Sequence, residues 1–425
     1  MNSWHWKPWK AMASLLLAVV GISAIVGWMN VRGEDPINEN HVSEKPLEQV
    51  VSRGAYLSRA GNCAACHTAR GGVAFAGGCA IETPFGIVYS SNLTPDPETG
   101  IGRWNQAHFW RAMHHGRSRD GRLLYPAFPY PDYTHITRED SDALYAFLRS
   151  LPPVSKANLT HDLRFPYNSQ VSLAVWRALF FSPASFEEDA SRSTEWNRGA
   201  YLVRGLGHCQ ACHAPRNIFG ATTEAANLSG GLIPMQNWYA PSLRSKVEAG
   251  VQDWSAEETI SLLRDGRTSH ATAMGPMADV VYGSTQYLSE TDLRAMATFL
   301  RDLPREEPQK PRPEFVPVGV RTLGARIYKA QCAECHGEEG EGGGNLYLSL
   351  AGQRTVTMQS SANLVKIIIN GGFAPTTAGN PRPFGMPPFG QNLSNAEIAA
   401  VASFVRSAWG NNAGPVSELD VFKVR

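Results

Sequence analysis

Residues 63–67 read Cys-Ala-Ala-Cys-His, and the pattern Cys-x-x-Cys-His returns as CQACH at 209–213 and as CAECH at 332–336. The three motifs use six of the seven cysteines of the chain. Two cysteines three positions apart on a helical turn can each form a thioether with one vinyl group of a haem. The adjacent histidine then lies under the ring as the fifth iron ligand. The motif therefore predicts three covalently bound haem c groups.

Each motif supplies two attachment residues and one iron ligand. Zinc sites with four cysteines place the second pair about 15–20 residues from the first, and these pairs lie much farther apart. A thioredoxin-like dithiol would not recur three times with an adjacent histidine. The predicted attachment residues are Cys63, Cys66, Cys209, Cys212, Cys332 and Cys335, and the predicted ligands are His67, His213 and His336.

The composition excludes two broad classes. Of the 425 residues, 43% are hydrophobic and 18% are charged, which excludes disorder as the main state. The 39 basic and 38 acidic side chains nearly balance, so the chain lacks the positive charge expected of a nucleic-acid-binding protein.

The surroundings of the motifs repeat as well. Each is preceded by a similar segment, from Arg53, Arg198 or Gly324, and each unit closes with an amphipathic helix capped by Thr137, Ser289 or Ser394. We therefore expect an all-α fold of three tandem cytochrome c-type domains with long loops. The predicted parts are an N-terminal membrane helix (1–30), domain 1 (50–155), a connector with an apolar helix (156–194), domain 2 (195–305), a Pro-rich linker (306–317), domain 3 (318–410) and a tail (411–425).

The N-terminus carries an uncharged, mostly apolar run from Met12 to Trp28, preceded by Lys7 and Lys10. The run is at the short end for a transmembrane helix and beyond the usual core of a signal peptide. The positive flank predicts a cytoplasmic N-terminus and a periplasmic body. The alternative is a cleaved signal peptide, which also exports the body.

The sixth iron ligand is usually methionine or histidine. In the third unit Met386 lies in a Gly/Pro loop before the closing helix, and we expect it to be the ligand there. In the second unit Met277 has the corresponding place, with Met274 as the competitor.

The first unit departs from this pattern, because Phe128 stands where a methionine is expected. Histidines are available instead, and His135 lies in the right region, just before the closing helix. We therefore expect a first haem with two histidine ligands, or one that lacks a strong sixth ligand. The other histidines are His108, His114 and His115.

Two further features stay open. Cys79 is the one cysteine outside the motifs, and we expect it to be a bystander in a loop. The run from Val171 to Phe181 is apolar nearly all round, which predicts either a helix buried between domains or an interfacial helix that contacts lipid or a partner.

From about residue 50 to the end, the sequence resembles the triheme cytochrome c subunits of bacterial membrane-bound dehydrogenases. Besides the three motifs, the resemblance rests on residues 76–102 (AGGCAIETPFGIVYSSNLTPDPETGIG), LYPAFPY at 124–130, GPMADVV at 275–281 and the segment 385–411. It implies that electrons leave a periplasmic catalytic subunit, cross the haems and reduce ubiquinone at the inner membrane. No residue of this chain is then expected to be catalytic towards the organic substrate.

The resemblance also bears on the partner. Such subunits serve flavin-dependent sugar or gluconate dehydrogenases, quinoprotein alcohol dehydrogenases and molybdenum-dependent oxidoreductases. The YPAFPY form resembles subunits paired with a molybdopterin catalytic subunit and a [2Fe-2S] subunit, so a membrane-bound aldehyde dehydrogenase is the expected partner. The alternatives are a quinoprotein alcohol or flavin sugar dehydrogenase, or electron delivery to a terminal oxidase or soluble cytochrome. A multihaem peroxidase is a further rival.

Overall fold

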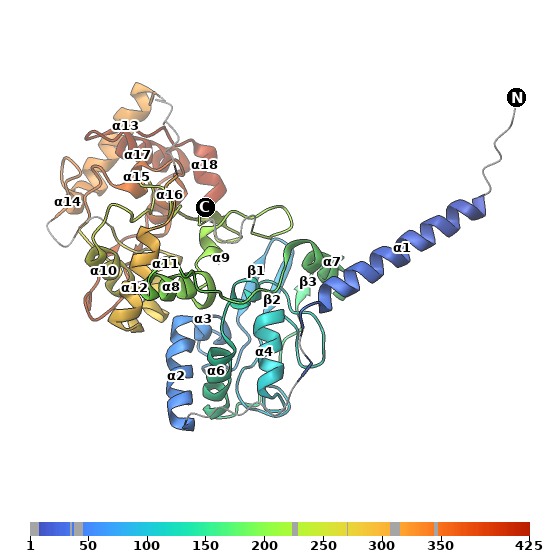
Figure 1. Cartoon of the computed structure of the whole chain (residues 1–425). Coiled ribbons are helices and arrows are strands. Elements are labelled where there is room, and N and C mark those ends of the chain that lie inside the picture. Colours follow the sequence, from blue (N-terminus) through green and yellow to red (C-terminus); the bar gives the residue numbers. More distant parts are fainter. Residues whose placement is uncertain are drawn as a thin grey trace, which may run out of the picture.

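The computed structural model describes residues 8–34, 36–37, 46–222, 228–269, 271–306, 315–343 and 347–425. A mostly helical body carries one long helix, α1 (Pro8–Val31), that projects from it (Figure 1). Residues 1–7 of the predicted anchor, with Lys7, and 307–314 of the predicted linker lie outside the described residues. The prediction of mostly helical domains is confirmed, although small antiparallel sheets accompany the helices.

Units one and two repeat the same order of elements. Unit one contains α2 (Leu47–Ala60), α3 (Cys63–His67), β1 (Ala80–Thr83), β2 (Gly86–Tyr89), α4 (Gln106–His115), α5 (Tyr130–Tyr133) and α6 (Arg138–Ser150). Unit two contains α8 (Thr194–Tyr201), the π-helical turn η1 (Leu202–Leu206), α9 (Gln210–His213), β4 (Gly231–Ile233), β5 (Trp238–Ala240), α10 (Ala256–Asp265), α11 (Pro276–Gly283), the 3₁₀ turn η2 (Thr285–Tyr287) and α12 (Glu290–Arg301).

Unit three shares the first helix, the motif helix and the closing helix, but its strands follow the middle helices, and it extends to the C-terminus. It contains α13 (Val318–Gln331), α14 (Ala333–His336), α15 (Arg354–Thr357), α16 (Ala362–Asn370), β6 (Gly372–Phe373), β7 (Gly385–Met386), α17 (Asn395–Ser407) and α18 (Glu418–Val424). The connector between units one and two forms β3 (Asp162–Leu163), which joins the sheet of unit one next to β2, and α7 (Gln170–Phe180).

The closing helices begin where the sequence predicts. The hydroxyl of Thr137 accepts from the backbone N–H of Asp140 at the start of α6, and Ser289 does the same for Asp292 at α12. Ser394 forms a full capping box with Glu397 at α17. These caps satisfy N–H groups that have no partner inside the helix, which fixes the first residue of each closing helix.

In every unit the first helix crosses the closing helix at a glycine. A Cβ on Gly324 would lie 2.2 Å from the carbonyl oxygen of Ala400, so no larger residue fits without moving backbone. The missing side chains let the two helices approach closely. The equivalent pairs, with distances of 1.9 and 2.0 Å, are Gly54 with Ala143 and Gly199 with Ala295.

Replacing Gly324 by alanine should therefore destabilise unit three by about 2–4 kcal/mol, since the obstacle is a carbonyl of a packed helix. Gly319 in the same helix is the matched control, because a Cβ there meets nothing within 4 Å. Gly319→Ala should be neutral or stabilise by up to about 1 kcal/mol through helix propensity. Thermal unfolding of the holoprotein followed by circular dichroism measures both, and equal melting temperatures would contradict the crossing argument.

Units one and two share one hydrophobic core, whereas unit three has its own. A reciprocal polar contact joins the first two units. Arg53 pairs with Asp140 of its own unit at 2.5 Å, and the hydroxyl of Tyr201 from unit two donates to the same carboxylate at 2.6 Å. The mirrored set in unit two is Arg198, Asp292 and Tyr56.

Unit three lacks this contact because Leu323 and Arg326 occupy the positions of the arginine and the tyrosine. It docks on unit two in another way. The side chain of Asn363 accepts from the backbone N–H of Tyr239 at 2.9 Å and donates to its carbonyl at 2.7 Å, as a neighbouring strand would. The backbone amide of β5 is thereby paired with a side chain of unit three.

Candidate haem sites

Each Cys-x-x-Cys-His motif follows the first helix of its unit, in unit two after the turn η1. The short helices α3, α9 and α14 hold the motifs, with Cys209 and Cys332 as N-caps, so the two cysteines of each lie on one turn. All seven cysteines lie within the described residues, and none forms a disulfide. Both thiols of each motif are therefore available for thioether bonds.

The three motif histidines have the same orientation. Each donates a hydrogen bond from Nδ1 to a backbone carbonyl farther along its unit: His67 to Ser91 at 2.8 Å, His213 to Pro241 at 2.7 Å and His336 to Leu348 at 3.1 Å. A carbonyl can only accept, so the proton sits on Nδ1 and the lone pair of Nε2 is free for a metal. Burial lowers the pKa of His67 and of His213, which favours this neutral form.

The surroundings of the cysteines do not suit a bound zinc ion. Among the described residues, no three His, Cys, Asp or Glu side chains converge as a metal site would require. Burial raises the pKa of Cys63 to about 11 and that of Cys209 to about 12, so these thiols are neutral at physiological pH. Thioether formation leaves an uncharged sulfur, which suits these buried positions. The motif residues therefore fit haem c.

A cavity of about 1050 Å³ joins units two and three. Its wall includes Cys212 and His213 on one side and Cys335 and His336 on the other. The volume is at the top of the range for one ligand, about 300–1,000 Å³. The second and third candidate haem sites therefore open into one another.

Both predicted methionine ligands line this cavity. Met277 begins α11 and packs against the core of units one and two, and Met386 in β7 packs against the core of unit three. Met274 lines the cavity too, but its methyl group lies toward Gly372 of unit three. Each candidate thus lies in the same space as its motif histidine, and iron ligation by Met277 and Met386 stays a prediction.

In unit one, the region where a sixth iron ligand is expected contains the aromatic rings of Phe128 and Tyr133. Phe128 packs against Tyr133 with ring centroids 5.4 Å apart. Tyr133 is buried near the motif. Its burial, and next the nearby Cys63 and Cys66, raise its pKa well above the usual range. His135 lies toward unit two, beside Gly205 of η1, and burial lowers its pKa.

The competing histidines of unit one have other contacts. His108 accepts from the backbone N–H of Asn105 in the capping box of α4, and His114 stacks on Trp110 with centroids 4.3 Å apart. His115 is buried, and its carbonyl accepts from Arg177. His135 therefore stays a prediction as the sixth ligand of the first haem.

Contacts between sites one and two were not predicted from the sequence. Gln210, inside the second motif, donates to the Asp132 carboxylate of unit one at 2.5 Å, and Tyr133 meets the ring of His208 at 5.5 Å. Burial raises the pKa of Asp132 to about 7. The second motif is thus built partly on unit one, and no spacing in the sequence indicated it.

Arg354, a cation in the wall of the shared cavity, was not predicted either. It belongs to α15 of unit three, yet it donates to the carbonyl of Gly250 in unit two at 2.6 Å and stacks over Trp254 at 5.4 Å. A half-buried guanidinium facing this space is suited to haem propionates.

Arg354→Gln should lower the reduction potential of one of the haems in this cavity by tens of millivolts, because a half-buried positive charge nearby stabilises the reduced state. Arg354→Lys keeps the charge and should restore most of the potential. Arg294→Gln, which removes an exposed ion-pairing arginine, is the control. Spectroelectrochemical titration measures all three, and unchanged potentials in Arg354→Gln would contradict a propionate role.

The chain is similar to known cytochromes c. The cytochrome c family model matches residues 51–152 and 322–409. The alcohol dehydrogenase (quinone) cytochrome c subunit of Gluconacetobacter polyoxogenes is 39% identical over 394 residues, covering 88% of this chain and 84% of that protein. The gluconate 2-dehydrogenase cytochrome c subunit of Pantoea cypripedii is 37% identical over 396 residues, covering 89% and 90%.

A third relative is much longer than this chain. A nicotinate dehydrogenase subunit of Pseudomonas putida is 41% identical over 365 residues, which cover 84% of this chain but 30% of that protein. The aldehyde dehydrogenase partner expected from the sequence is not shown by these relatives, and the alcohol and sugar-acid types support the alternative better. From its motifs and its relatives, the chain belongs to the multihaem cytochrome c subunits of membrane-bound dehydrogenases.

Proposed function

We propose that this chain carries electrons from a periplasmic dehydrogenase subunit through three haem c groups to ubiquinone in the inner membrane. The observation that carries the proposal is the continuity of the three sites. Gln210 of motif two donates to Asp132 of unit one at 2.5 Å, and Asn62, next to motif one, lines the shared cavity, so motifs one and two are neighbours. The shared cavity then continues from motif two to motif three.

The chain's own residues hold and tune the redox centres. Haem iron supplies the one-electron chemistry once it is bound. The Nδ1 hydrogen bonds fix the plane and the tautomer of the motif histidines, and the apolar walls of the cavity would exclude water from a bound haem. Ligand identity, burial and charges such as Arg354 then set the reduction potential of each site.

For the dehydrogenase we favour a quinoprotein alcohol or flavin-dependent sugar or sugar-acid type, by analogy with the alcohol and gluconate relatives. A molybdenum-dependent aldehyde dehydrogenase with a [2Fe-2S] subunit is the second candidate. Phe128 in the YPAFPY segment favours it, together with the 41% identity to the nicotinate dehydrogenase relative.

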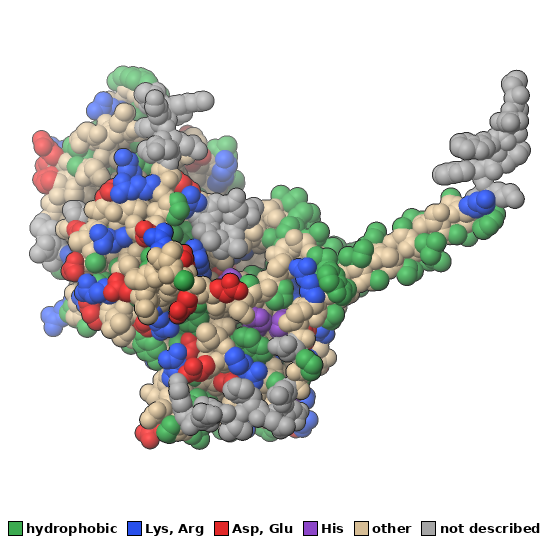
Figure 2. Space-filling model, in the orientation of Figure 1, with side chains coloured by type: hydrophobic (Ala, Val, Ile, Leu, Met, Phe, Trp, Pro, Cys, Tyr) green, Lys and Arg blue, Asp and Glu red, His purple; other side chains and the backbone are tan. Residues whose placement is uncertain are grey.

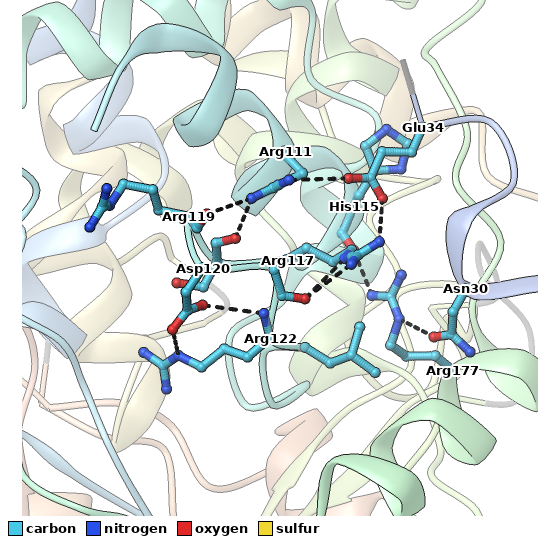
Figure 3. Close-up of polar contacts among 12 residues, drawn as sticks. Asn30, Glu34, Arg111, His115, Arg117, Arg119, Asp120, Arg122 and Arg177 are labelled. Carbon is cyan, nitrogen blue, oxygen red and sulfur yellow. Dashed lines mark hydrogen bonds and ion pairs between the residues drawn. The ribbon is translucent and has the colours of Figure 1, made fainter. Parts of the chain in front are cut away.

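We further propose that α1 is a retained anchor and not a cleaved signal. The segment Trp9–Val31 is long and apolar enough to span a membrane, which by itself fits both. What favours an anchor is the segment that follows, which is built into unit one (Figure 3). Glu34, mostly buried, pairs with Arg117 at 2.9 Å and with Arg111 at 3.6 Å.

The test is a cofactor inventory and a quinone assay on the complex purified in mild detergent. Three haems c with pyrroloquinoline quinone or flavin, and substrate-driven reduction of a short-chain ubiquinone, are expected. Molybdenum with non-haem iron would select the second candidate. Reduction of a soluble cytochrome without quinone reduction would overturn the proposed acceptor. Mass spectrometry of the intact chain decides whether α1 is retained.

A further inference from the structure

One face of α7 is apolar and uncovered. Leu173 and Arg177 are buried, whereas Val171, Val175 and Leu179 are 74%, 43% and 67% exposed. The three exposed residues are spaced four apart, so they form one stripe along the helix. The sequence of α7, QVSLAVWRALF, contains no carboxylate. The helix is therefore not enclosed between domains, which was one of the two interpretations of this segment.

Neighbouring loops enlarge this stripe into a patch. Phe165, just before α7, is 84% exposed, and Ile218 of unit two is 85% exposed. The loop that carries Ile218 is tied to α7, since Trp176 donates from Nε1 to the carbonyl of Phe219 at 2.9 Å. Figure 2 shows hydrophobic side chains gathered where α1 meets the body. Soluble surfaces rarely expose contiguous apolar area of this kind without a partner.

The end of α1 fixes where this patch lies. Asn30, in the last turn of α1, donates to the carbonyl of Ala174 in α7 at 2.9 Å and accepts from Arg177 at 2.9 Å (Figure 3). Trp28, earlier on the same helix, is 61% exposed and lies beside Arg32. Tryptophan with arginine is typical of a helix end at the headgroup level. The patch is therefore held at that level beside α1.

We propose that the lipid bilayer covers this patch, defined by Val171, Val175, Leu179, Phe165 and Ile218, so that α7 lies in the interface as a second membrane contact. The proposal rests on the retained anchor proposed above. It follows from the continuity of the patch with the exit of α1 and from its lack of carboxylates, which suits an anionic membrane surface. The contact holds unit one against the bilayer.

The test labels single cysteines with an environment-sensitive fluorophore in the full-length holoprotein. Cys79→Ser removes the free thiol, and the haem-bound cysteines do not react. Val175→Cys reports on the patch, and Val247→Cys, at a valine of unit two with the same 43% exposure, is the matched control. Ile22→Cys reports on α1, and Leu179→Cys repeats the patch measurement if Val175→Cys folds poorly.

The probes are read in vesicles of phosphatidylethanolamine and phosphatidylglycerol that carry quenchers at the headgroup or deep in the chains. We expect about twofold or stronger quenching at Val175 by shallow quenchers, at Ile22 by deep ones, and none at Val247. Quenching at Ile22 alone would overturn the interfacial contact and leave the anchor intact. No quenching at either site would overturn both. A Val175 signal that changes only when the catalytic subunit is added would make that subunit the occupant and overturn the proposal.

Discussion

Replacing Cys209 and Cys212 together by alanine should remove the second haem and reduce substrate-driven quinone reduction by on the order of 100-fold or more. Motif two lies next to motif one and shares its cavity with motif three, so its loss interrupts the series of sites. The wall of the cavity between units two and three would also lose the haem that it is expected to contact. We therefore expect the core of units one and two to be less stable in this variant.

The measurement is the rate of ubiquinone reduction by the purified complex, with haem counted per chain by the pyridine haemochrome method. Cys79→Ala is the control, because it removes a thiol outside the motifs and should leave three haems and the full rate. A double variant with two haems and an undiminished rate would show that electrons bypass the second site. Such a result would contradict the order of sites proposed here.

Replacing Met386 by histidine should lower the potential of the third haem by on the order of 0.2 V, within the range of about 0.8 V that axial ligands set. Met386 is held in β7, where it pairs with Gly372, and it lines the cavity that contains His336. The methionine-to-iron charge-transfer band of this haem should disappear at the same time.

The matched control for this variant is Met358→Leu. Met358 lines the same cavity and is 2% exposed, but its place in the interior of unit three indicates packing. A change of similar volume there should cost less than about 1.5 kcal/mol and leave the potential and the band unchanged. Loss of the band in Met358→Leu, with its retention in Met386→His, would make Met358 the ligand.

The sequence by itself determined the local chemistry of this protein. Each Cys-x-x-Cys-His motif predicts its attachment residues and its histidine ligand within one helical turn, and no distant residue is needed for this prediction. Thr137, Ser289 and Ser394 begin the closing helices because their hydroxyls accept from N–H groups three residues later. These are short-range effects, so they can be seen in a single sequence.

The tertiary structure decided how the repeats assemble. Arg53, Asp140 and Tyr201 come from segments far apart in the chain, and their contact makes one core of units one and two. Arg354 and Gly250 meet across the boundary of units two and three for the same reason. Such long-range contacts depend on how the helices pack. The residue types alone do not indicate which partner each side chain meets.

The helix α7 shows the same division between sequence and structure. The composition of residues 171–181 predicts an apolar helix. It does not indicate which face of the helix packs against the rest of the protein. That depends on Asn30 and Arg177, which join the helix to the end of α1. Burial of one face and exposure of the other are properties of packing, and only the folded chain decides them.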